Sequence, residues 1–271
     1  MAQIPARTER NRARLESLDA DAFDVPAAVL CAICGQADCP GCTPADELAS
    51  GVMAIVPWER PYGSGWTRLW STAMATTQGA DAFFAALPDG GIPPAMRFAI
   101  IAEVLAVGSM VLMLLPLAAL ALPQLAFQVV VDPTLRLRVV EWFVVGVPAL
   151  ALWMVAAHAT HGAALDVGAR RQGGRSQRKR ALRFGLYACG WDLMTGPLGA
   201  IWILTTRGMK AASELLGLSM RVPGKASNAL LKGVYGLSEE EASRAQKPGT
   251  VAAVALAVLS AFGVLLVIAL A

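Results

Sequence analysis

Charged side chains are scarce in this sequence of 271 residues. They make up 16% of the chain, whereas hydrophobic residues make up 56% and the mean hydropathy is +0.53. A soluble globular domain carries about 25% charged residues, so this shortage of charge excludes an ordinary soluble protein. The composition therefore predicts a membrane protein.

Several catalytic and binding motifs are also missing. The sequence has no glycine-rich phosphate loop, no Ser–His–Asp set and no paired-His zinc motif on a helix. We therefore expect a protein that is not an enzyme. The net charge of +3 does not indicate nucleic-acid binding, because the basic residues lie between hydrophobic segments, where they set membrane topology. Residues 1–24 are mostly polar, so no cleavable secretory signal is expected and the N-terminus is predicted to stay in the cytoplasm.

Three apolar stretches are long enough to cross a bilayer, which takes about 20 helical residues. Residues 98–122 contain one charge, Glu103, and residues 250–271 contain none. Residues 139–161 include Pro148, which a spanning helix tolerates when neighbouring helices satisfy the freed backbone groups. These stretches predict three membrane-spanning helices.

A fourth apolar stretch, residues 184–218, is interrupted at Gly196-Pro197. The connection before it, residues 162–183, is strongly cationic and so belongs on the cytoplasmic side. A single crossing at 184–206 would place the seven later basic residues outside, whereas a short or re-entrant hairpin returns them to the cytoplasm. We expect the hairpin, buried against the other helices. The predicted fold class is an all-α membrane protein, a polytopic helical bundle of about five membrane segments, with the N-terminus cytoplasmic and the C-terminus outside.

The cationic connection is interpreted first as a solvated loop that fixes topology. Cations at a membrane surface also attract anionic lipid, at about 1 kcal/mol each. The candidate anionic-lipid-facing residues are Arg170, Arg171, Arg175, Arg178, Lys179, Arg180 and Arg183.

The chain before residue 97 is more polar. Residues 1–30 predict a flexible tail, and residues 43–63 predict a linker punctuated by Pro and Gly. Residues 64–96 carry apolar side chains at helical spacing: Trp66, Leu69, Trp70, Ala73 and Met74, followed by Phe83, Phe84 and Leu87. We interpret them as amphipathic interfacial helices that lie on the bilayer, although burial in a protein core explains the same pattern equally well. Residues 97–271 then form the transmembrane helical domain.

Four cysteines form a compact motif, in which Cys31 and Cys34 are followed by Cys39 and Cys42. Two chelating pairs let four thiolates converge on one tetrahedral Zn²⁺, so residues 31–42 predict a zinc knuckle with one structural ion. An iron–sulfur cluster or a redox dithiol is the alternative, and a cytoplasmic location argues against disulfides. The fifth cysteine, Cys189, lies in the hairpin and is interpreted as an inert packing residue.

Ionisable residues inside the apolar stretches are candidates for function, because burying their charge in lipid is costly. Glu103 and His158 fall at similar depth near the cytoplasmic ends of their helices, and Asp192 falls close to the hairpin turn. These three residues form a candidate intramembrane polar site. They are either a structural pairing or part of an ion or proton pathway.

Several strings taken in order resemble the YIP family in its bacterial form fused to a zinc ribbon. The strings are the cysteine motif, Pro57-Trp58-Glu59, the segment with Thr72 that ends in Phe83-Phe84, the span that starts at Phe98, His158, Gly168-Ala169-Arg170-Arg171, Tyr187, Gly196-Pro197-Leu198-Gly199 and the apolar helix after Ala245. The resemblance covers residues 31–271 and implies a small multispanning protein of the bacterial inner membrane with a cytosolic N-terminus and five membrane segments. Residues 1–30 contain no Cys or His, so the second zinc of some relatives is not expected. Residues 211–247 are also longer and more polar than the family pattern.

For function, the resemblance implies a non-enzymatic, membrane-organising or interaction scaffold. Its partners would be the lipid bilayer and a protein bound through the cytosolic N-terminal region. The alternative is a small transporter or an ion- or proton-conducting protein that uses Glu103, His158 and Asp192. A membrane redox sensor built on the cysteine motif is a third hypothesis.

Overall fold

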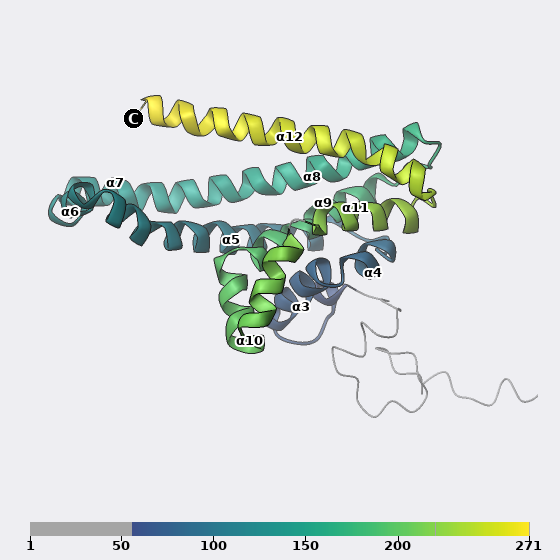
Figure 1. Ribbon diagram of the computed structural model, residues 1–271, viewed down its shortest axis with the longest axis horizontal. Coiled ribbons are helices and arrows are strands. Elements are labelled where there is room, and N and C mark those ends of the chain that lie inside the picture. Colours follow the sequence, from purple (N-terminus) through teal and green to yellow (C-terminus); the bar gives the residue numbers. More distant parts are fainter. Residues whose placement is uncertain (1–55, 220, 271) are drawn as a thin grey trace, which may run out of the picture. The chain divides into compact units, whose positions relative to one another are not determined.

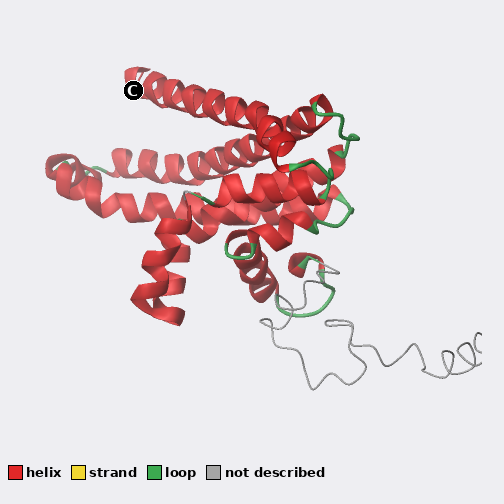
Figure 2. Ribbon diagram, turned by 45° about the vertical axis from the view of Figure 1, so that its right-hand side comes forward, coloured by secondary structure: helices red, strands yellow, loops and turns green. Residues whose placement is uncertain are grey.

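A computed structural model describes residues 56–219 and 221–270, and every regular element in these two ranges is a helix (Figure 2). The chain divides into two compact units, and all described residues belong to the second, Met53–Ala271. Three long helices dominate this unit: α5 (Ile92–Ala121), α8 (Val147–Arg171) and α12 (Glu239–Leu270). Helix α8 packs between the other two (Figure 1).

Three helices in the described ranges are long and apolar enough to cross a membrane. They are Ile92–Ala121, Pro133–Arg171 and Glu239–Gly263, of 30, 39 and 25 residues. They contain most of each of the three apolar stretches singled out in the sequence, so these three spanning candidates are confirmed. The helices on either side of Gly196-Pro197 do not meet the same criteria. The five-segment arrangement therefore stays a prediction.

The connection between the first two spanning candidates is also helical. Helix α6 (Pro123–Val131) is followed by α7 (Pro133–Glu141), and the carboxylate of Asp132 starts α7 by accepting a hydrogen bond from Thr134 N at 2.8 Å. A π-helical turn, η2 (Trp142–Gly146), joins α7 to α8, whose second residue is Pro148. Because proline has no N–H to donate to the preceding turn, a widened turn at this point keeps the helix continuous.

Burial changes sharply along the long helices. The buried residues of α5 lie between Ala95 and Val107, and its large apolar side chains are mostly exposed from Met110 onward. In α8 the change is less sharp: Leu150, Leu152 and Trp153 are exposed, but Val147 and Ala151 are buried in a small cluster with Val107 of α5. We call residues 110–153 and 251–263 the apolar section, and residues 56–107, 155–195 and 222–249 the helical head. The apolar section presents a broad hydrophobic surface, as a bilayer-facing region does.

Helix α9 (Arg178–Thr195) lies at the centre of the head, with 12 of its 18 residues buried. It packs against α3 (Gly65–Thr77), α5, α8 and α10 (Pro197–Ser219). Two glycines allow the close approach: a Cβ on Gly185 would lie 2.2 Å from the His158 carbonyl oxygen, and one on Gly190 would lie 2.5 Å from Thr76 Oγ1. Small residues of this kind let helix backbones meet at short distance.

Most of the apolar face of residues 64–96 is covered by protein, although Trp66 at the start of the segment is 49% exposed. Trp70, Phe83, Phe84 and Leu87 are each at most 3% exposed, in α3, α4 (Ala80–Ala85) and the turn that follows. Helix α3 packs on α9, and α4 packs on α11 (Val222–Gly233). The structure therefore favours the core interpretation over interfacial helices anchored by these side chains. Helical spacing defines an apolar face, but it does not say whether protein or lipid covers that face.

The predicted break after α9 is present. Helix α9 ends at Thr195, Gly196 is extended (ψ 176°), and α10 starts at Pro197. Helix α10 then bends sharply at Gly208, whose φ of 86° lies in the left-handed region that glycine tolerates best. The short 3₁₀ helix η1 (Pro57–Glu59) precedes α3, and Ser238 caps α12 in a reciprocal arrangement with Glu241.

Candidate functional site

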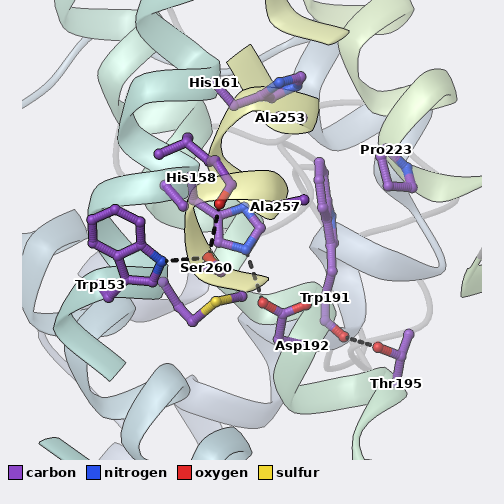
Figure 3. A pocket seen from close by; sticks show the side chains of 13 residues that line it. Trp153, His158, His161, Trp191, Asp192, Thr195, Pro223, Ala253, Ala257 and Ser260 are labelled. Atoms are coloured by element: carbon purple, nitrogen blue, oxygen red, sulfur yellow. Dashed lines mark hydrogen bonds and ion pairs between the residues drawn. The ribbon is translucent and has the colours of Figure 1, made fainter. Parts of the chain in front are cut away.

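Three helices of the head bring Glu103, His158 and Asp192 together. His158 Nε2 lies 2.8 Å from Asp192 Oδ2 (Figure 3). The same nitrogen lies 3.6 Å from Glu103 Oε1. Glu103 comes from α5, His158 from α8 and Asp192 from α9. The candidate polar site predicted from the sequence is thus a real spatial cluster, which we call the polar cluster.

Helix packing explains this placement. Helices α8 and α9 meet at their glycines, since a Cβ on Gly162 would lie 2.2 Å from the Ala181 carbonyl oxygen and one on Gly185 would lie 2.2 Å from that of His158. This contact sets His158 directly against α9. Asp192 follows two turns later in α9, on the same side of the helix, and its carboxylate reaches the imidazole.

Cys189 is a member of the cluster that the sequence analysis missed. Its Sγ, a carboxylate oxygen of Glu103 and a ring nitrogen of His158 all lie within 4.8 Å of one another. Cys189 and Asp192 are three residues apart in α9, which places them on one helix face. That spacing was visible in the sequence, but the hydrophobic surroundings of Cys189 favoured a packing role.

Glu103 is the least solvated of the three ionisable residues predicted for the cluster. Its side chain is 1% exposed, compared with 16% for His158 and 34% for Asp192. Among the described residues, neither carboxylate oxygen of Glu103 has a hydrogen-bond partner, and His158 Nε2 is hydrogen-bonded to Asp192 instead. A buried carboxylate without a donor is costly unless a positive charge or a proton compensates it.

A cavity of about 330 Å³ opens beside the polar cluster. Helices α8, α9 and α12 form most of its wall, and His158, Asp192 and Trp191 lie on its surface (Figure 3). A second histidine in the wall, His161, is held by Gly249 O at 3.1 Å and by Ser227 Oγ at 3.3 Å. Most of the remaining wall is apolar, so the main polar side of the cavity is at His158 and Asp192.

The cationic connection divides into exposed and buried members. The exposed members are Arg170, Arg171, Arg175, Arg178 and Lys179, and Arg180 is partly buried. Arg183 was wrongly predicted to face lipid. Its side chain is 0% exposed, and its guanidinium pairs with Glu59 Oε1 at 2.9 Å and donates to Gly91 O at 2.9 Å. The α9 helix carries Arg183 to its inner face, whereas the residues before α9 stay at the surface.

Glu59 is therefore a structural anchor. It accepts a 2.6 Å hydrogen bond from the Tyr187 hydroxyl in addition to the Arg183 contact, so η1 is tied to two successive turns of α9. Burial, reinforced by the hydrogen bond to Glu59, raises the pKa of Tyr187 and keeps the hydroxyl protonated as the donor. Pro57-Trp58-Glu59 and Tyr187 both entered the family resemblance, and the structure joins them.

Asp166 is another residue whose role the sequence did not reveal. Its side chain is 2% exposed and accepts hydrogen bonds from Tyr235 Oη and Gln177 N, both at 2.8 Å. Ser176 Oγ and Arg170 Nε also contact the carboxylate. Asp166 therefore connects the cationic loop between α8 and α9 to Tyr235, in the turn that follows α11.

No family model, curated protein or solved structure matches this chain. The cysteine motif Cys31, Cys34, Cys39 and Cys42 lies outside the described residues, and so do the predicted tail and most of the linker.

Proposed function

We propose that the protein is a non-enzymatic integral membrane protein that acts as a membrane-organising or interaction scaffold of the YIP type. The observation that carries this proposal is the division of Met53–Ala271 into an apolar section and a packed head. The apolar section supplies a membrane anchor, and the head offers a folded surface with an exposed cationic loop. The zinc knuckle at residues 31–42 completes the proposal as a cytosolic partner-binding module.

Charge asymmetry supports an orientation with the head at the cytoplasmic side. The α6–α7 connection carries Asp132, Arg136, Arg138 and Glu141, which sum to zero charge. The α8–α9 connection is strongly cationic. Under the positive-inside rule the second connection is cytoplasmic, so three crossings put the N-terminus inside and the C-terminus outside. In a bacterium this membrane is the inner membrane.

The length of α5 supports a position of the polar cluster near the cytoplasmic boundary of the bilayer. Glu103 lies 18 residues before Ala121 in α5, since 121 − 103 is 18. At 1.5 Å per residue, these two residues are about 27 Å apart along the helix axis. A bilayer core about 30 Å thick that starts near Ala121 ends close to Glu103. The polar cluster then lies at the inner boundary of the bilayer.

Site-specific photo-crosslinking in membranes tests the scaffold. A photoreactive residue at Arg171 or Arg178, both at the surface of the head, is expected to yield a discrete protein adduct. The same residue at Leu114 or Val258, which are exposed in the apolar section, is the matched control and should label lipid. Loss of the head adduct in a Cys31→Ser/Cys34→Ser chain would assign the partner to the knuckle. Head positions that label no protein would contradict the scaffold function.

The polar cluster favours a second candidate function, an ion- or proton-conducting protein. Glu103, His158 and Asp192 are three titratable groups in contact beside a cavity, an arrangement found in proton relays. Purified protein in liposomes should then carry a pH- or cation-dependent flux that Asp192→Asn reduces. Flux no greater than in empty liposomes would exclude this candidate.

A further inference from the structure

The polar cluster contains the donor atoms of a transition-metal site. Glu103, His158 and Cys189 come from three different helices and contribute an oxygen, a nitrogen and a sulfur within 4.8 Å of one another. In a tetrahedral zinc site with bonds of about 2.0–2.3 Å, the ligand atoms lie roughly 3.3–3.8 Å apart. His158 Nε2 and Glu103 Oε1 already stand at 3.6 Å. We propose that Glu103, His158 and Cys189 bind one divalent transition-metal ion, with Zn²⁺ as its representative, between α5, α8 and α9.

Charge balance fits a buried position. A zinc-bound cysteine is a thiolate and a zinc-bound histidine is neutral. With the Glu103 carboxylate, the two negative charges equal the two positive charges of the ion. The loaded site is therefore neutral, which suits side chains that are 1% exposed for Glu103 and fully buried for Cys189.

The metal also resolves the unpartnered state of Glu103. Within the described part of the chain, both of its oxygens are buried without a hydrogen bond, and Cys189 Sγ makes a long contact of 3.8 Å to Gly185 O. The hydrogen bond between His158 Nε2 and Asp192, which lie 2.8 Å apart, leaves Glu103 without a donor, and in the metal-bound form the ion takes the place of that proton on Nε2. An ion among the three side chains supplies a partner for each of them at once.

Asp192 and the cavity complete the site. The Asp192 carboxylate is 34% exposed at the cavity wall beside His158, where it is placed to hold a water molecule in the fourth position. Its own negative charge stays at this partly exposed edge, outside the neutral set of three ligands and ion. The cavity reaches the cluster at His158 and Asp192, which lie on its wall, and so gives an ion access to this side of the site (Figure 3). The inference is independent of the scaffold proposal, because it concerns residues of the head alone.

The test must separate this site from the cysteine motif near the N-terminus. The full chain is therefore purified in detergent with Cys31, Cys34, Cys39 and Cys42 changed to Ser, equilibrated with buffered Zn²⁺, and its zinc measured by mass spectrometry. We expect one zinc per chain. Binding should be lost in Cys189→Ala and in Glu103→Gln, and weakened about 10- to 100-fold in Asp192→Asn if the carboxylate acts through a bound water.

A histidine in the same cavity is the matched control. His161→Gln should keep the zinc, because His161 is held by Gly249 and Ser227 and lies outside the ligand group. Cobalt gives a second readout, since a thiolate-to-cobalt charge-transfer band should be present in the four-serine chain and absent after Cys189→Ala. Circular dichroism of each variant shows that it is folded. A folded four-serine chain that binds no zinc, or a Cys189→Ala variant that binds it unchanged, would overturn the proposal.

Discussion

The contact between α8 and α9 can be tested by adding one methyl group. In Gly185→Ala, the new Cβ would meet the His158 carbonyl oxygen at 2.2 Å and the Ala159 Cα at 2.9 Å. Ordinary contacts begin at 3.4 Å, so the two backbones must separate by about 1.2 Å, the difference between 3.4 and 2.2 Å. Both obstacles are main-chain atoms of a helix and cannot rotate away as a side chain can.

The expected loss of stability follows from two opposing effects. Overpacking costs about 1–3 kcal/mol, and the upper end applies because neither backbone can adapt locally. Alanine gains about 1 kcal/mol over glycine in helix propensity. The net loss is therefore about 2 kcal/mol. For a domain of this size, that loss lowers Tm by roughly 4–8 °C.

A glycine with open space around it provides the control. Gly224 lies in α11, and a Cβ there meets nothing within 4 Å among the described residues. Gly224→Ala should therefore raise the unfolding free energy by up to about 1 kcal/mol, which reflects propensity alone. Thermal unfolding of both variants in the same detergent makes the comparison, and NMR of the His158 ring reports whether its contact with Asp192 lengthens. If Gly185→Ala is as stable as Gly224→Ala, the close packing of α8 on α9 is wrong.

Three further substitutions test other contacts of the head. Arg183→Ala should lower the unfolding free energy by about 3–5 kcal/mol, because it leaves the largely buried carboxylate of Glu59 without its positive partner. Thermal unfolding of a double-mutant cycle with Glu59→Gln should then show a coupling energy, which two independent residues would lack. Asp166→Asn should lower the unfolding free energy by about 1.5–3 kcal/mol, because the charged carboxylate accepts the hydrogen bonds that hold this loop. Amide hydrogen exchange in residues 172–177 should become faster, and unchanged exchange there would argue against the anchoring role. Phe84→Ala should lower the unfolding free energy measured by chemical denaturation by about 3–5 kcal/mol, as expected for a fully buried ring in a protein core. A negligible loss of stability would instead favour the interpretation that this segment lies on the bilayer surface.

Hydrophobic length was the most informative property of the sequence. The stretches 98–122, 139–161 and 250–271 predicted the three long apolar helices, because a continuous apolar run of this length is typical of a membrane-spanning helix and rare in soluble domains. The break at Gly196-Pro197 was also predictable, since proline starts a helix readily and does not continue one. The polar cluster was partly predictable, as helix register placed Glu103 and His158 at similar depth.

The missed features depend on packing between distant segments. Nothing in the spacing of residues 64–96 distinguishes a protein neighbour from lipid, and only the fold shows that protein covers Trp70. Arg183 belongs to a run of basic residues by composition, yet the turn of α9 carries it inward to Glu59. Cys189 has a hydrophobic local sequence, and its neighbours Glu103 and His158 come from two other helices.

The division of the molecule requires that a bilayer surrounds the apolar section and leaves the head on the aqueous side. Single-cysteine variants at Leu114 and Arg171, made in a chain with all five native cysteines replaced, test this arrangement with a membrane-impermeant maleimide on inverted and right-side-out vesicles. Both residues are exposed on the protein surface, so burial within the fold does not bias the comparison. We expect Arg171→Cys to react only in inverted vesicles and Leu114→Cys to react in neither until detergent is added. Rapid labelling of Leu114→Cys in intact vesicles would show that the bilayer does not lie where the apolar section is. Labelling of Arg171→Cys from the outside would contradict the cytoplasmic placement of the head.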